Sequence, residues 1–262
     1  MNSFYSYTLR THTGLIRSSN QDRIKVLSSR EMILDCLLAD GMGGHQGGDL
    51  AATLAIECFE KFSFPSPEIE ENISSLFQNI NEKIKDEQRR EEKLKEMGTT
   101  LVYAQVKMLP IPEIYLAHIG DSRAYLLLDK NLFTLTKDHS VGEEMLAQNL
   151  YSSRDLIGNR KEDFALFKAL GHIESEGIKE SMSSCFLPSS FWKSCSCQNW
   201  CLLLCSDGLH GVISHQTMQE TLIKTTLSLE EKSEELLARA LEAGGRDNIS
   251  FILIEKTEKT KE

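Results

Sequence analysis

The sequence lacks the features that mark secreted, membrane-spanning and nucleic-acid-binding proteins. Its first residues contain no basic segment followed by an apolar run, so we expect no signal peptide. Its longest apolar stretches, such as 33–39 and 200–205, are too short to span a bilayer. Lys and Arg number 29 against 39 Asp and Glu, a net charge of −10, which argues against a basic face for nucleic acid or an anionic membrane. We therefore expect a cytoplasmic protein that binds neither.

The seven cysteines do not follow a pattern that gives them a function. An odd number without a signal peptide does not predict a disulfide framework. Five of them lie between positions 185 and 205, but no CxxC pair occurs, so structural zinc is a minor alternative. Cys201 and Cys205 have the same parity within an apolar run, which is typical of thiols that face the core from a strand. Nucleotide-binding motifs of the types GxxxxGKS/T and GxGxxG are also absent.

What remains predicts one folded unit. At 262 residues, 40% of them hydrophobic, the chain can bury a sizeable core, and no linker divides it, so we expect a single domain over residues 1–262. Only five prolines and no long polar tract argue against wholesale disorder.

Apolar runs and turn residues outline the order of elements. Strands are predicted at 4–10, 32–39, 99–107, 113–119, 122–128, 131–135, 200–205 and 249–255, and helices at 46–62, 69–97, 141–149, 214–225 and 229–243. Strands at hairpin spacing, with paired helices between the runs, predict an α+β layered sandwich rather than a doubly wound parallel sheet. Residues 150–195 show only a short helical pattern at 164–170.

Aspartates stand at the ends of these strands. Asp40, Asp121 and Asp207 each come at or just after the end of an apolar run, and Asp22 and Asp247 shortly precede one. Taken singly, the Asp-Gly and Gly-Asp pairs are typical of turns. As a set, they predict carboxylates that converge at one side of the sandwich, where they repel one another unless a cation lies between them.

The chemistry of this set favours a hard divalent cation. Mg²⁺ and Mn²⁺ take oxygen ligands from Asp, backbone carbonyls and water, and no consistent His or Cys accompanies the aspartates. The loop 41–48 holds more glycine than an ordinary turn requires, which allows the backbone to approach a ligand closely. Arg17 is near enough in sequence to Asp22 to reach the same site, where its guanidinium suits a phosphate dianion.

Eight motifs in order resemble the bacterial form of the metal-dependent serine/threonine protein phosphatases of the type-2C family. They extend over roughly residues 14–254 and are highly specific as an ordered set. They are Arg17-Ser-Ser-Asn-Gln-Asp22, Ala39-Asp-Gly-Met-Gly-Gly-His-Gln-Gly-Gly48, Gly98-Thr-Thr-Leu101, Gly120-Asp-Ser-Arg-Ala-Tyr125, Thr136-Lys-Asp-His-Ser140, Ala169-Leu-Gly171, Cys205-Ser-Asp-Gly-Leu209 and Asp247-Asn-Ile249.

The resemblance implies a fold and a reaction. The fold is a four-layer αββα sandwich, in which two mainly antiparallel β-sheets are flanked by helices, with a flap-like segment at about 140–195. The reaction is hydrolysis of phosphoserine and phosphothreonine in proteins, with a binuclear Mn²⁺ or Mg²⁺ centre that activates water for direct attack on phosphorus, without a phosphoenzyme. The expected substrates are phosphorylated proteins, targets of a Ser/Thr kinase, and the expected state is a monomer.

The resemblance also implies roles for individual residues. Asp40 would bridge both metals, and the Gly41 carbonyl would bind one of them. The other metal would be held by Asp207 and Asp247. Asp22 would belong to the same metal-binding set, and Asp121 would join Asp207 at a weaker third metal site. Arg17 would bind the substrate phosphate. The residues that carry catalysis would be Arg17, Asp40 and Asp207.

The sequence departs from the family pattern at three places. Many members have Glu at the position of Gln21, and some have a proposed general-acid His at that of Met42, whereas the only histidine of this loop is His45. The flap lacks the His-Pro and Arg-Asn residues often found before Ala-Leu-Gly.

An alternative to an active phosphatase is a phosphatase-fold regulatory protein with weak or no activity that acts by binding a partner. The presence of all of the expected metal-binding aspartates argues against it. A third reading is an enzyme specialised for one phosphorylated partner.

Overall fold

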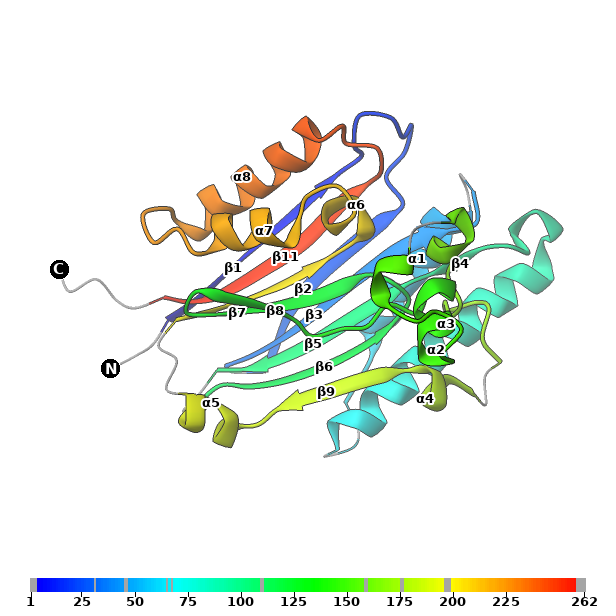
Figure 1. Ribbon diagram of the computed structural model, residues 1–262. Coiled ribbons are helices and arrows are strands. Elements are labelled where there is room, and N and C mark those ends of the chain that lie inside the picture. Colours follow the sequence, from blue (N-terminus) through cyan, green and yellow to red (C-terminus); the bar gives the residue numbers. More distant parts are fainter. Residues whose placement is uncertain are drawn as a thin grey trace.

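Two antiparallel β-sheets form the centre of the molecule (Figure 1). The computed structural model describes residues 4–30, 32–44, 47–64, 66, 68–108, 111–157, 160–174, 177–195 and 199–257. One sheet has the order β1-β11-β10-β7-β8, and the other β2-β3-β5-β6-β9 with β4 paired to β3. The strands are β1 (Phe4–His12), β2 (Asp22–Arg30), β3 (Ile33–Met42), β4 (Gly98–Thr99), β5 (Leu101–Lys107), β6 (Glu113–Ile119), β7 (Arg123–Leu128), β8 (Asn131–Thr134), β9 (Ser183–Leu187), β10 (Trp200–Cys205) and β11 (Ile249–Thr257).

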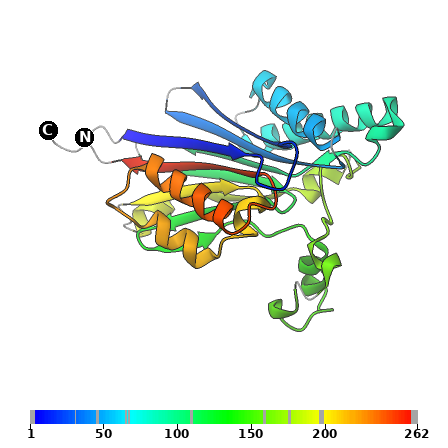
Figure 2. The ribbon, with the colours of Figure 1, turned by 90° about the horizontal axis from the view of Figure 1, so that it is seen from above.

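Helices cover the outer face of each sheet, as Figure 2 shows from above. Against the β2-β3-β5-β6-β9 sheet pack α1 (Gly47–Lys61) and α2 (Ile69–Arg90), and against the other sheet pack α6 (Asp207–His210), α7 (His215–Leu222) and α8 (Leu229–Glu242). The remaining helical segments are η1 (Glu92–Leu94), α3 (Val141–Ala147), η2 (Arg154–Leu156), η3 (Lys161–Phe164), α4 (Ile178–Ser181) and α5 (Ser189–Cys195). None of the helices in the described ranges combines the length and apolar character needed to cross a membrane.

Alternating side chains divide the interior into three apolar layers. On β10, Leu202 and Leu204 point between the sheets, whereas Cys201, Leu203 and Cys205 point toward α6–α8. This period of two explains why the central strands read as continuous apolar runs, since both of their faces are buried. The four-layer αββα arrangement expected from the sequence is therefore confirmed.

The pairing of β1 with β11 brings Phe4 and Thr257 together at one end of the sandwich. The register runs from Phe4 opposite Thr257 to His12 opposite Ile249. Beyond His12 the chain enters the loop that carries Arg17, and just before Ile249 it carries Asp247. Both of these residues therefore lie at the end of the sheet that is distant from Phe4 and Thr257.

The four strands between 99 and 135 do not form a run of hairpins, contrary to the expectation from their spacing. β6 pairs with β5 in one sheet, whereas β7 pairs with β8 and β10 in the other. The segment 120–122 therefore crosses between the sheets. Both β6 and β7 are buried on both faces, so their sequences look alike although they belong to different sheets. The hydrophobic pattern therefore does not reveal that the chain crosses between the sheets. Gly120 adopts φ +108°, and a Cβ atom there would lie 2.6 Å from Cβ of Thr100.

Two other predicted elements differ from the structure, and one strand was not predicted. The helix expected over 69–97 ends at Arg90, because Glu91 is extended and η1 follows it. The helical pattern at 164–170 is wrong: η3 ends at Phe164, and Ala165 is extended so that Leu166 can bridge to Ser140. β9 was not predicted, because it is an edge strand with mostly exposed or half-buried side chains and so lacks an apolar pattern.

Replacing Gly120 by Ala is expected to destabilise the protein by about 2–4 kcal/mol, because the added Cβ meets Thr100 in a backbone conformation that L-residues avoid. Urea unfolding of purified protein measures the loss. Gly177→Ala is the matched control, because Gly177 has ordinary φ and its nearest neighbour would lie 3.8 Å from the new Cβ. Equal midpoints for the two variants would contradict the crossing described above.

Candidate functional site

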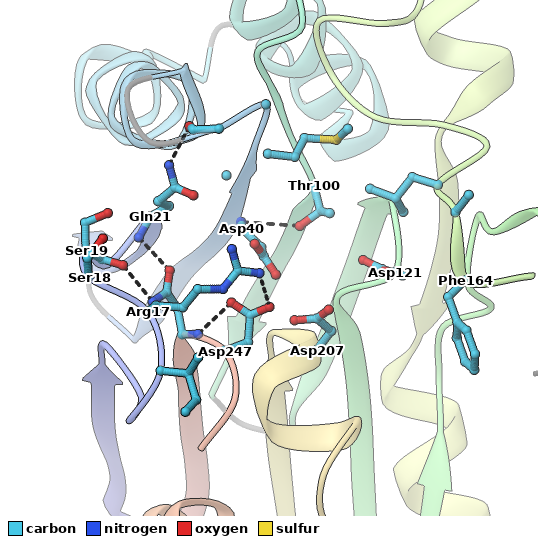
Figure 3. A pocket seen from close by; sticks show the side chains of 18 residues that line it. Arg17, Ser18, Ser19, Gln21, Asp40, Thr100, Asp121, Phe164, Asp207 and Asp247 are labelled. Carbon is cyan, nitrogen blue, oxygen red and sulfur yellow. Dashed lines mark hydrogen bonds and ion pairs between the residues drawn. The ribbon is translucent and has the colours of Figure 1, made fainter. Parts of the chain in front are cut away.

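A cavity of about 670 Å³ opens at the end of the sandwich where the loops of both sheets meet (Figure 3). Its lining includes most of the residues singled out in the sequence, namely Arg17, Asp40, Gly41, Asp121, Asp207 and Asp247. The remaining one, Asp22, is buried and does not reach the cavity wall. Residues from distant parts of the chain are thus brought together as the spacing predicted.

Asp40 and Asp22 face each other across the β2–β3 pair. They are directly opposite in the antiparallel register, where like charges destabilise a sheet. The backbone of Asp40 is fixed from the other side, since its carbonyl accepts from Thr99 Oγ1 at 2.9 Å and from the Thr100 amide at 2.9 Å. Ser206 Oγ donates to Asp22 Oδ2 at 2.9 Å. The fold therefore holds two carboxylates together that would otherwise separate.

Close backbone approaches position the other residues of the site. A Cβ on Gly41 would lie 2.1 Å from the Gly48 carbonyl oxygen, so only glycine allows the start of α1 to pack against the end of β3. In the same way, a Cβ on Gly208 would lie 1.9 Å from the Asn248 carbonyl oxygen. The second approach sets Asp207, the first residue of α6, beside the loop that carries Asp247.

Burial and mutual repulsion disfavour the charged form of these carboxyl groups. Burial raises the pKa of Asp40 well above its usual range, and the neighbouring carboxylates raise it further. Burial and other nearby carboxylates raise the pKa of Asp22 to about 6, that of Asp207 to about 6 and that of Asp121 to about 7. Such a cluster requires positive charge from a proton or a cation.

The donor atoms fit a hard divalent cation. Asp22 Oδ1 is buried and accepts no hydrogen bond, so one carboxylate oxygen of the site has its ligand capacity unused. Four aspartates line the cavity together with Gly41, and carboxylate and backbone carbonyl oxygens are the ligands that Mg²⁺ and Mn²⁺ prefer. Within the described residues, no three Asp, Glu, His or Cys side chains already surround one point at ligand distances.

Arg17 pairs directly with one aspartate of this set. Its Nη2 donates to Asp247 Oδ2 at 2.6 Å, and its side chain is half exposed. The loop that carries it is fixed by Asn248, whose Nδ2 donates to the carbonyls of Thr13 at 2.8 Å and Ser19 at 2.9 Å. Arg17 can therefore pair with a carboxylate of the site or turn toward an anion in the cavity.

Supporting residues near the aspartates were not assigned roles from the sequence. Ser206 and Thr100 hydrogen-bond Asp22 and Asp40, respectively, and Asn248 anchors both strands of the Arg17 loop. Each belongs to or adjoins one of the recognised motifs, so membership of a motif was the feature of the sequence that could have identified them.

Gln21 donates from Nε2 to the Gly44 carbonyl at 2.8 Å, a bond that Glu could not make, and so ties the two loops together. His45 lies outside the described residues.

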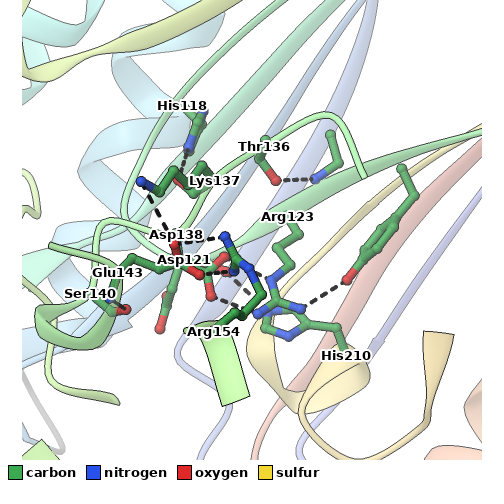
Figure 4. A network of polar contacts seen from close by, with 12 residues as sticks. His118, Asp121, Arg123, Thr136, Lys137, Asp138, Ser140, Glu143, Arg154 and His210 are labelled. Carbon is green, nitrogen blue, oxygen red and sulfur yellow. Dashed lines mark hydrogen bonds and ion pairs between the residues drawn. The ribbon is translucent and has the colours of Figure 1, made fainter. Parts of the chain in front are cut away.

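A second polar network supports the loop that carries Asp121 (Figure 4). Asp138 accepts two hydrogen bonds of 2.7 Å from Arg123, and His210 Nε2 lies 3.0 Å from the Asp121 carbonyl. His139 Nδ1 accepts from the Gly120 amide at 3.2 Å, and its ring stacks on His118. These contacts give Asp138 and His139 a structural role.

The cysteine-rich segment offers no zinc site within the described residues. Cys201 and Cys205 are buried in the core as their parity predicted, and burial raises the pKa of both thiols. Cys185 and Cys195 are half-buried, whereas Cys197 lies outside the described residues. No metal-ligand cluster includes any of the four that are described.

Comparison with known proteins identifies close relatives of this arrangement. Residues 16–242 match the family model of protein phosphatase 2C. The serine/threonine phosphatase stp of Listeria welshimeri is 33% identical over 253 residues, which cover 94% of each chain. The structure of the Mycobacterium tuberculosis serine/threonine phosphatase PstP/Ppp has a TM-score of 0.77 and 27% identity, over 97% of this chain and 99% of that one. A PstP catalytic domain solved with two manganese ions has a TM-score of 0.74 and 26% identity, over 98% of this chain and all of that one.

Asp40→Asn is expected to raise the melting temperature of the metal-free protein at pH 7.5, because it removes a buried charge that its neighbours repel. A gain of about 1 kcal/mol corresponds to roughly 2–4 °C in a chain of this size. Mn²⁺ at about 1 mM should stabilise the wild type, because a ligand that binds the folded state shifts the unfolding equilibrium by mass action. The same variant should lose most of this stabilisation. Thermal melting with and without Mn²⁺ measures both effects. A metal-free variant less stable than wild type would contradict the repulsion.

Proposed function

The chain belongs to the protein phosphatase 2C family, and we propose that its aspartate-lined cavity hydrolyses phosphoserine and phosphothreonine in proteins. The observation that carries the proposal is the convergence of Asp22, Asp40, Asp121, Asp207 and Asp247 beside Arg17, whose half-exposed guanidinium pairs with Asp247. Repelling carboxylates at a cavity need divalent cations, and a cavity so charged attracts a phosphate. The solved relative with two manganese ions supports the same assignment.

We infer that Mn²⁺ or Mg²⁺ occupies the acidic floor. Asp40, which interacts electrostatically with the other four aspartates, would hold both ions, together with the Gly41 carbonyl for one of them and Asp207 and Asp247 for the other. Asp22 has a free buried oxygen in the same set, and Asp121 with Asp207 could hold a weaker third ion. When bound, such ions offset the carboxylate charge, polarise water and stabilise charge on the phosphoryl group.

Arg17 is the residue that recognises the phosphate. Its guanidinium pairs with Asp247 at the edge of the cavity, and it would be able to turn toward a phosphate if cations neutralised that carboxylate. Its fork can then donate to two phosphate oxygens. The loop anchored by Asn248 keeps this side chain at the mouth of the cavity.

The lining of the cavity favours direct attack by water. Among the described lining residues there is no cysteine or histidine, so neither of these covalent phosphoryl carriers faces the substrate. Asp40 and Asp207 are buried beside other carboxylates, so they are suited to binding cations rather than to attacking the phosphate. This arrangement supports hydrolysis without a phosphoenzyme.

Further properties follow from the same reading. We also propose that the protein is a monomer whose catalytic domain extends over residues 1–262 and includes the flap. The substrates would be proteins that a Ser/Thr kinase has phosphorylated in the cytoplasm.

Hydrolysis of p-nitrophenyl phosphate is expected to require Mn²⁺, to stop with EDTA, and to fall by at least about 100-fold in Asp207→Asn, because removal of a group that stabilises transition-state charge costs that much. Asp129→Asn is the control, since Asp129 lies at the exposed β7–β8 turn in a conformation that Asn tolerates. Activity that survives EDTA would defeat the metal-dependent reaction. A folded wild type without turnover on this ester or on phosphopeptides would support the regulatory alternative.

Arg17→Ala is expected to lower kcat/KM for phosphoserine peptides by about 10- to 100-fold, the value of one or two hydrogen bonds to a charged group. Arg17→Lys should recover only part of the loss, because an ammonium group cannot make the planar fork. Arg89→Ala on the exposed end of α2 is the matched control. Steady-state kinetics with Mn²⁺ held constant give the comparison, and an unchanged kcat/KM in Arg17→Ala would refute the assigned role.

A further inference from the structure

Between residues 140 and 170 the flap buries two of its carboxylates: Glu143 is 7% exposed and Asp163 only 1%. Its large apolar side chains are exposed, with Leu150 at 66%, Phe164 at 67% and Phe167 at 53%. Figure 2 shows this green segment extending away from the sandwich. Polar contacts therefore hold the flap together, and its apolar side chains remain available.

Asp163 is the centre of the contacts that fix Phe164 beside it. Its Oδ1 accepts from the Tyr151 hydroxyl at 2.6 Å, and its Oδ2 accepts from the Arg160 amide at 3.2 Å. The Arg160 guanidinium also lies over the Tyr151 ring, 5.4 Å from its centroid. These contacts set the start of η3, which ends at Phe164. Phe164 is thus exposed on a backbone that is held in place.

The segment after Phe164 is tied to the loop beneath it. The Ala165 carbonyl accepts from the Val141 amide at 2.9 Å, and the Phe167 amide donates to the His139 carbonyl at 2.7 Å. His139 in turn contacts Gly120, next to Asp121. The position of Phe164 is therefore linked to the acidic floor of the cavity through a short chain of hydrogen bonds.

Ile16 supplies an apolar side chain on the facing wall. It is 71% exposed, immediately precedes Arg17 and lines the same cavity as Phe164. Its loop is held by the Leu15 amide, which donates to the Gly245 carbonyl at 2.7 Å, and by Asn248. In Figure 3 the labelled Arg17 and Phe164 stand on opposite sides of Asp207 and Asp121. Apolar walls thus flank the place where the phosphate would bind.

The cavity is larger than a phosphate requires. Its volume of about 670 Å³ is in the range of sites for ligands of drug size. The apolar walls and the aspartates belong to one cavity. If a phosphorylated protein binds with its phosphate at the aspartates, the residues next to the phosphorylated side chain are the ones that reach these walls.

We propose that Ile16 and Phe164 form a specificity subsite that selects substrates with a large apolar residue within three positions of the phosphoserine or phosphothreonine. The inference rests on the proposed function and adds to it a class of substrate sequence. An apolar side chain next to the phosphorylated residue that packs on either wall would lose water contact together with an exposed hydrophobic group of the enzyme. Asp163 acts as a positioning residue, because it fixes the backbone from which Phe164 projects.

The test uses phosphoserine heptapeptides of glycine and alanine that carry a single Leu at each flanking position in turn, with the Leu-free peptide as reference. For the wild type with Mn²⁺, at least one Leu peptide is expected to have a kcat/KM about fivefold to tenfold above the reference. This ratio should fall below about twofold in Ile16→Ala and in Phe164→Ala, and Phe164→Leu should keep most of it. Phe133→Ala, at an exposed aromatic on β8 outside the cavity, should retain the full ratio.

The outcomes separate this inference from the function on which it depends. A wild type that cleaves all peptides equally, or a ratio that survives both alanine substitutions, would overturn the subsite and leave the phosphatase assignment intact. A wild type without Mn²⁺-dependent hydrolysis of p-nitrophenyl phosphate would defeat both. Misfolding does not explain a lost ratio if the melting temperatures stay equal, which is expected because both side chains are more than two-thirds exposed.

Discussion

Repulsion between buried carboxylates is the constraint on which the site of this protein depends. Asp40 and Asp22 are forced into direct opposition by the β2–β3 register, and the loops after β10 and before β11 add Asp207 and Asp247. Hydrogen bonds from Ser206 and from the threonines of 99–100 fix these residues without neutralising them. Two pairs of close backbone contacts, made possible by glycine, keep the loops from separating. Much of the local sequence is thus explained by the need to hold like charges together.

The sequence allowed most of the fold to be predicted where its pattern reflects burial. Strands buried on both faces, such as β3 and β10, are unmistakable apolar runs, and α8 carries both a regular apolar stripe and a capping box at Ser228 and Glu231. The edge strand β9 and the extended segment after Phe164 were missed because their side chains are exposed. The passage of the chain between sheets at Gly120 was missed because it depends on tertiary pairing, which no local period records.

The candidate site was predictable for a different reason. Aspartates at strand ends signal turns individually, and only their number and the glycine-rich loop suggested a ligand. The structure brings them to one cavity, together with Arg17. It also adds what residue types alone could not give: the pairing of Arg17 with Asp247, the bond from Gln21 to Gly44, and the buried Asp22 behind the wall. Each of these depends on side-chain direction, which motif spacing does not determine.

The β1–β11 pairing has a practical consequence for the way in which the protein can be handled. Phe4 and Thr257 are paired at one end of the sheet, and the cavity lies beyond the other end, about 25–30 Å away along strands of nine residues. A purification tag, a fluorescent label or a surface tether attached near either of these two residues would therefore emerge on the side opposite to the catalytic mouth. Immobilised protein would present that mouth freely to large phosphorylated substrates.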